Sequence, residues 1–172
     1  MFSKLSILSI SILAVVAMAP LAVAAPGVWS AEEVLERSDI VVVATLQDVE
    51  WECLDGPSSS RISPSCFFDH GRGRLSLEQV VLGSFAEPTV SIYWRNAVSC
   101  PRADYRPLEG RRALWFLRKH VPDGRLPELV IPLDDASQVG TALERLKRAH
   151  DQGPDQRIQA IVRVLAAAKP SS

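Results

Sequence analysis

The chain has 172 residues, with 19 basic and 20 acidic side chains and a formal net charge of −1 at pH 7. This near-neutral balance argues against a general nucleic-acid-binding protein, which needs an excess of Lys and Arg on one surface. After residue 25 no apolar run approaches the roughly 20 residues that cross a bilayer as a helix, which excludes a later membrane span.

Residues 1–25 have the pattern of a secretory signal peptide. Lys4 gives a positive start, Leu5 to Met18 is an apolar run, and Ala22-Val23-Ala24 is a small-x-small cleavage site. An uncleaved membrane anchor is the alternative, but Pro20 interrupts an apolar run that is already short for a span. We therefore expect an exported protein, periplasmic or secreted, whose mature part has the length of one domain.

The segment Ser38–Trp51, SDIVVVATLQDVEW, predicts the strand around which the fold is organised. Its run of β-branched residues, Ile40–Val43, favours a strand because such side chains pack well on a pleated surface. The run is apolar on both faces at its start and mixed at its end, which is typical of a strand that leaves a core at a rim. Simple alternation places four residues on one face: Val43, Thr45, Gln47 and Val49.

Further strand patterns follow, separated by turn signals. Gly71-Arg72-Gly73 predicts a kink or bulge, and the apolar phase shift between Leu77 and Val80 predicts a second bulge. The long stretch 96–110, which contains Cys100 and two prolines, predicts an irregular connection. The expected strands are 74–82, 89–94, 112–121 and 126–131.

Helical patterns lie at both ends of this strand-rich region. Ser30-Ala31-Glu32-Glu33 is a capping box for a short first helix, and Asp135 with Gln138 can cap a second. Apolar residues at helical spacing continue to about Leu165, across a break at Gly153-Pro154. The expected fold is α+β, mainly β: a five-stranded closed barrel over 26–133, a short N-terminal helix, two C-terminal helices packed on the barrel over 134–168, and a tail over 169–172.

Four features occur together: SDIVVVATL after a short helix, RLSLEQVVLGS as the second strand, Cys100 after the third, and LEGRRALWFLRK around Gly110. In this combination the chain resembles the netrin-like domain of tissue inhibitors of metalloproteinases, as found in small exported bacterial proteins. The resemblance covers roughly residues 30–131 and implies an OB-type five-stranded barrel. The family's inhibitors present a Cys-x-Cys pair at the mature N-terminus, and here no Cys precedes Cys53. No residue therefore inherits a protease-binding role.

Cys53 and Cys66 flank the loop after the first strand, and we predict a disulfide between them. In the chain-entropy account such a bond stabilises the fold by roughly 3 kcal/mol. A metal site built from these cysteines with Asp69 and His70 is the alternative. A structural zinc site needs four ligands, and an oxidising compartment favours the disulfide, so no metal or other cofactor is expected.

Cys100 is then the odd thiol of the three. A nucleophilic cysteine needs a base within reach, and His70, His120 and His150 are scattered along the chain. No catalytic set is visible, which predicts a protein that is not an enzyme. A metal- or thiol-dependent enzyme is the alternative.

Charged residues are unevenly distributed. Residues 32–55 carry eight acids and only Arg37, whereas residues 95–125 carry eight bases against three acids. Solvated faces that attract each other across the fold are the simpler interpretation, and a basic patch for an acidic partner is the alternative.

Aromatic residues of the third and fourth strands suggest a partner-facing surface. Alternation places Trp94 and Phe116 inward and gives Tyr93 and Trp115 the outward phase. With Arg95 and Arg112 close to them in sequence, Tyr93 and Trp115 form a candidate partner surface, unless the C-terminal helices cover it. The predicted function is an exported non-enzymatic binding module whose partner is another exported or envelope protein. A structural accessory protein of the cell envelope is the alternative.

Overall fold

The structure is a computed structural model that describes residues 29–53, 69–96, 104–120 and 124–168. The predicted signal peptide and tail lie outside these residues, as do Cys66 and Cys100. In chain order the elements are α1 (Ala31–Arg37), β1 (Ile40–Cys53), β2 (Asp69–Leu82), β3 (Thr89–Asn96), the 3-10 helix η1 (Arg106–Leu108), β4 (Arg112–His120), β5 (Gly124–Pro132), α2 (Ala136–Gln152) and α3 (Gln156–Ala168).

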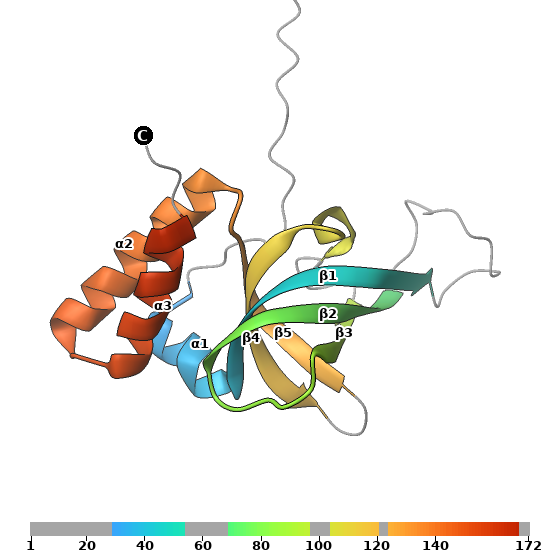
Figure 1. The fold of residues 1–172 in the computed structure, drawn as a ribbon, viewed down its shortest axis with the longest axis horizontal. Coiled ribbons are helices and arrows are strands. Elements are labelled where there is room, and N and C mark those ends of the chain that lie inside the picture. The colour runs from blue at the N-terminus through green and yellow to red at the C-terminus, as the bar shows by residue number, and fades with distance from the viewer. Residues whose placement is uncertain (1–28, 54–68, 97–103, 121–123, 169–172) are drawn as a thin grey trace, which may run out of the picture.

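The five strands close into a barrel in the order β1-β2-β3-β5-β4. Neighbouring strands are antiparallel, except that β3 and β5 pair in parallel. The three α-helices gather on one side of the barrel (Figure 1). The predicted α+β fold, mainly β and with an OB-like closed barrel, is therefore confirmed. Among the described residues, the helices are too short or too polar to span a membrane.

The first half of β1 is buried on both faces. Val42 and Ala44 point into the barrel, where they meet Trp115. Val41 and Val43 point outward into a second core that the helices cover. None of these four valine and alanine residues is more than 1% exposed. Because full burial of one such valine stabilises the fold by about 1.5 kcal/mol or more, this short segment stabilises both cores.

A bulge in β1 breaks the simple alternation that the sequence suggested. The pairing with β2 jumps from Gln47 opposite Arg74 to Glu50 opposite Arg72, and Asp48 has a φ of 52°. Asp tolerates this left-handed conformation better than most residues. Val49 therefore turns to the barrel interior, so its predicted position on the face of Val43 was wrong.

Gly71 and Gly73 lie inside β2, so the strand begins before them and not at Arg74 as expected. The predicted bulge is present there, because two residues of β1, Asp48 and Val49, lie opposite the single residue Gly73. Both glycines face the barrel interior, where side chains of the interior core fill the space beside them. A Cβ on Gly71 would lie 2.1 Å from Trp94 Cζ2, and one on Gly73 would lie 2.8 Å from Leu46 Cδ1. The missing side chain of Gly71 thus makes room for the indole, and that of Gly73 makes room for Leu46. Further along β2, the predicted bulge between Leu77 and Val80 is confirmed by register shifts there.

The segment before β4 closes one end of the barrel, which its irregular sequence did not predict. Tyr105 and Leu108 are buried in the interior core. The Tyr105 ring stands edge-on to Trp94 at 5.2 Å between centroids and 5.7 Å from that of Trp115. Burial raises the pKa of Tyr105, and the nearby Glu128 adds to the effect. In the same segment, the Arg106 guanidinium lies 4.9 Å from the ring centroid of Trp51.

Both predicted helix caps are present. Ser30 Oγ accepts a hydrogen bond from the Glu33 N–H at 3.0 Å, and Asp135 Oδ1 accepts from the Gln138 N–H at 3.1 Å. The preceding Asp134 accepts from Arg111 Nε at 2.9 Å and also from the terminal guanidinium nitrogen. This bidentate pair ties the start of α2 to the entry of β4.

Substitution Gly71→Ala should destabilise the protein by about 3 kcal/mol or more, because the new methyl group overlaps Trp94 in a filled core. Urea unfolding measures the loss. Gly140→Ala is the matched control, since nothing lies within 4 Å of its new Cβ. In the middle of α2 it should raise stability by about 0.5–1 kcal/mol. Equal unfolding midpoints for Gly71→Ala and the unchanged protein would contradict this packing.

The Arg111–Asp134 pair predicts a small contribution to the free energy of unfolding that is lost at acid pH. Hydrogen bonds from Arg111 hold the pKa of Asp134 below its ordinary value. A carboxylate with a lowered folded pKa stabilises the fold above its unfolded pKa of about 3.9, and this is lost as pH falls through the folded pKa. Asp134→Asn should therefore cost up to about 1 kcal/mol at pH 7, since the pair is partly exposed, and progressively less as the pH falls through the folded pKa. A difference that stays constant across that range in urea titrations would refute the assignment.

Candidate functional site

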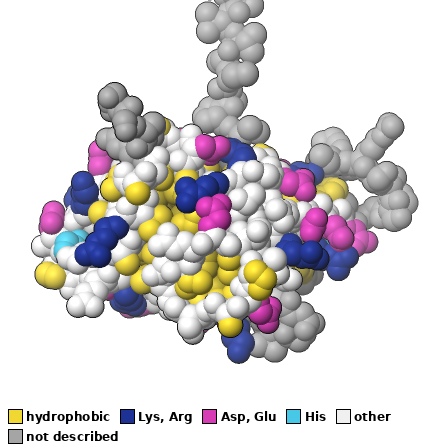
Figure 2. Space-filling view, in the orientation of Figure 1, with side chains coloured by type: hydrophobic (Ala, Val, Ile, Leu, Met, Phe, Trp, Pro, Cys, Tyr) yellow, Lys and Arg dark blue, Asp and Glu magenta, His cyan; other side chains and the backbone are white. Residues whose placement is uncertain are grey.

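One side of the barrel is left uncovered by the helices. There β1, β2 and β3 run beyond the helical layer, and acidic and basic side chains lie interspersed over that end of the molecule (Figures 1 and 2). OB folds commonly bind ligands on the face of strands 2 and 3. We call this surface the open sheet face, and its outward residues are Asp48, Glu50, Glu52, His70, Arg72, Arg74, Ser91 and Tyr93.

Two ion pairs and one histidine–carboxylate contact join β1 to β2 across the open sheet face. Arg74 Nη1 lies 3.2 Å from Asp48 Oδ2, Arg72 bonds Glu50, and His70 Nε2 lies 3.4 Å from Glu52 Oε2. Apart from His70, these side chains are more than half exposed. Such exposed pairs contribute at most about 1 kcal/mol each. These charged side chains of β1 and β2 can therefore exchange ionic partners at little cost in free energy.

An aromatic side chain of β3, that of Tyr93, flanks the basic row, which is formed by His70, Arg72 and Arg74 of β2. Tyr93 of β3 is half-buried and pairs in register with Arg72. Its ring lies 6.1 Å from the His70 ring between centroids, at an angle of 37°. The two rings lie side by side at a tilt beside the charges of the open sheet face. Tyr93, predicted to face a partner, is thus placed on the barrel's uncovered side.

The other predicted partner-facing residues are not gathered around Tyr93. Arg112 begins β4, lies opposite Thr45 and bonds Glu78 of β2. β4 is no neighbour of β3, so Arg112 belongs to a different part of the barrel surface. The backbone of Arg95 pairs with His70, and its side chain lies outside the described structure.

The prediction that Trp115 faces a partner was wrong. Trp115 is 0% exposed in the barrel interior, where its Nε1–H donates to the Ala44 carbonyl at 3.2 Å. Phe116, expected inward, instead points outward beneath the helices. β4 is apolar on both faces, and alternation alone does not say which face is the interior.

The basic segment is largely neutralised by carboxylates, so the alternative of a bare basic patch is not supported by the described residues. Asp104 illustrates this: partial burial works to raise its pKa, but hydrogen bonds from Arg106 outweigh burial and lower it. The acidic run pairs mainly with β2, although Asp39 lies 3.6 Å from Arg125. The remaining pairs of the basic segment are Arg106–Asp104, Arg111–Asp134, Arg112–Glu78 and Arg118–Glu128.

The cysteine predictions stay untested. Cys53 ends β1 opposite Asp69, but its side chain lies outside the described residues, as do Cys66 and Cys100. His70, a proposed metal ligand, contacts Glu52. Within the described ranges no three His, Cys, Asp or Glu side chains are grouped to hold a metal ion.

No protein-family profile, curated protein or solved structure gives a significant match to this chain. The geometry alone must therefore suggest the chemistry. The open sheet face offers cations, carboxylates and two rings.

Proposed function

We propose that the protein is an exported, non-enzymatic binding module with a netrin-like barrel, and that its partner is another exported or envelope protein. The signal-peptide pattern of residues 1–25 supports export. The barrel topology supports a binding role, because OB folds serve mainly as scaffolds for ligand-binding faces. One observation carries the proposal: the helices bury one side of the barrel, and within the described ranges no helix covers the open sheet face.

The composition of the open sheet face suits a protein partner. Tyr and Arg are the residue types that most often dominate binding energy at protein interfaces, and here Tyr93 adjoins Arg72. The charge rows add specificity, because a partner must present opposite charges in matching positions. Since the existing ion pairs are solvated, a partner's charges can replace them without exposing a buried ion.

Site-specific photo-crosslinking in the native organism tests this function. A photoreactive amino acid at Ser91, which is exposed beside Tyr93, should give a discrete adduct with one envelope or exported protein. Adding Tyr93→Ala or Arg72→Glu should reduce the adduct at least about tenfold, a loss of roughly 1.4 kcal/mol in binding.

The matched control places the same photoreactive group at Arg148 on the exposed surface of α2. There no such adduct is expected, and Arg148→Glu should leave the Ser91 adduct unchanged. An adduct that forms only from Arg148, or one that survives both open-face substitutions, would contradict the assignment of the binding surface.

A further inference from the structure

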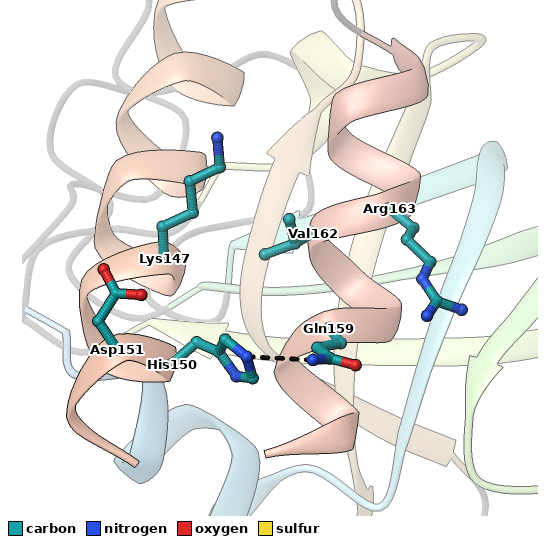
Figure 3. A pocket seen from close by; sticks show the side chains of 6 residues that line it. All are labelled: Lys147, His150, Asp151, Gln159, Val162 and Arg163. Atoms are coloured by element: carbon teal, nitrogen blue, oxygen red, sulfur yellow. Dashed lines mark hydrogen bonds between the residues drawn. The ribbon is translucent and has the colours of Figure 1, made fainter. Parts of the chain in front are cut away.

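One side chain of α2 closes the turn that joins α2 to α3. His150 lies in the last turn of α2 and points toward α3, where it meets Gln159 (Figure 3). Its Nδ1 accepts a hydrogen bond from the Asp155 N–H at 3.2 Å, and its Nε2 lies 3.1 Å from the terminal amide of Gln159. A single imidazole therefore contacts both the backbone and a side chain at the start of α3.

The hydrogen bond to His150 completes the N-terminal cap of α3. Asp155 directly precedes this helix, and its carboxylate accepts a hydrogen bond from the Arg157 N–H at 2.8 Å. In a capping box, a Glu or Gln at the third helical position would accept from the N–H of the capping residue itself. That position is occupied by Ile158, which is apolar and buried. His150 of the preceding helix therefore supplies the acceptor that the sequence of α3 lacks.

This hydrogen bond defines the protonation state of the His150 ring. Because Nδ1 accepts from the Asp155 N–H, it carries no proton, and the one proton of the neutral ring is on Nε2. The Nε2–H group needs an acceptor, so the amide of Gln159 must turn its oxygen to the ring. A second proton would bind to Nδ1 and face the Asp155 N–H, which would bring two donors together.

The charged groups around the ring offer no replacement for the lost hydrogen bond. They are Lys147, Asp151 and Arg163, which line the hollow beside His150, the Asp155–Arg157 pair, and Glu36 of α1, whose charge acts on Arg157. None of the three lining groups points at the ring in Figure 3. The Asp155 carboxylate already pairs with Arg157 at 2.7 Å, and the ion pairs of the described residues include none with His150. A protonated ring would therefore lose the Asp155 N–H and gain no ion pair in this position.

We propose that His150 is a pH-sensitive switch in the α2–α3 turn: the neutral ring closes the turn, and the protonated ring releases it. Histidine is the side chain whose charge ordinarily changes between about pH 8 and pH 5. Ile158 and Ile161 of α3 lie in the core that the helices cover, so release of the turn loosens one of the helices over that core. This inference does not depend on the proposed protein partner.

NMR of the ¹⁵N-labelled full chain tests the switch. At pH 8 the ring of His150 should carry its proton on Nε2 alone, and a scalar coupling should connect the Asp155 amide nitrogen with His150 Nδ1 across the hydrogen bond. At pH 5 the ring should be charged and the coupling absent. The hydrogen-exchange protection of the Asp155 amide, corrected for the intrinsic pH dependence of exchange, should fall about tenfold between these two conditions.

Two variants separate protonation from a merely structural role. His150→Asn keeps an acceptor that does not titrate, so the protection of Asp155 should change less than about twofold between pH 8 and pH 5. His150→Ala removes the acceptor, and the protection should be low at both values. A proton on Nδ1 at pH 8, a ring still neutral at pH 5, full protection of Asp155 beside a charged ring, or an equal pH-dependent loss in His150→Asn would overturn the proposal.

Discussion

The structure depends on the double burial of β1 between Ile40 and Ala44. One face of this short segment belongs to the barrel interior, and the other belongs to the core that the helices share. A barrel without helices would leave Val41, Val43 and Phe116 in water, at a cost of about 1.5 kcal/mol or more for each. The stability of the barrel therefore depends on the helices, because the outward apolar side chains of β1 and β4 must be buried beneath them.

The same constraint explains which part of the barrel surface the helices leave uncovered. From Thr45 onward, before the bulge at Asp48, β1 is polar on its outer face, and the helical layer ends where the apolar stripe of Val41 and Val43 ends. Across that end of the sheet, exposed ion pairs replace the apolar contacts. Because solvated pairs add little to stability, this end of β1 is held less firmly than the segment between Ile40 and Ala44.

Sequence patterns predicted the elements well where physical preferences are strong, as in the β-branched run of β1 and the caps at Ser30 and Asp135. They failed where both faces of a strand are apolar, so Trp115 was predicted to point outward and Phe116 inward, the reverse of the structure. The left-handed Asp48 left no local signal. Gly71 and Gly73 did leave one: two glycines two residues apart mark a bare stripe on one face of a strand. Recognising that stripe places Arg72 outward, and with it the basic row of the open sheet face.

Amide hydrogen exchange along β1 measures double burial most directly. The backbone N–H groups of Val41 to Ala44 should exchange slowest in the chain and only by global unfolding, since both faces and both neighbouring strands protect them. Those of Glu50 to Glu52, in the same strand but beyond the helical layer, should exchange at least about tenfold faster through local opening. Equal protection along the whole strand, or faster exchange at Val41 to Ala44, would contradict the view that this segment holds the barrel and the helices together.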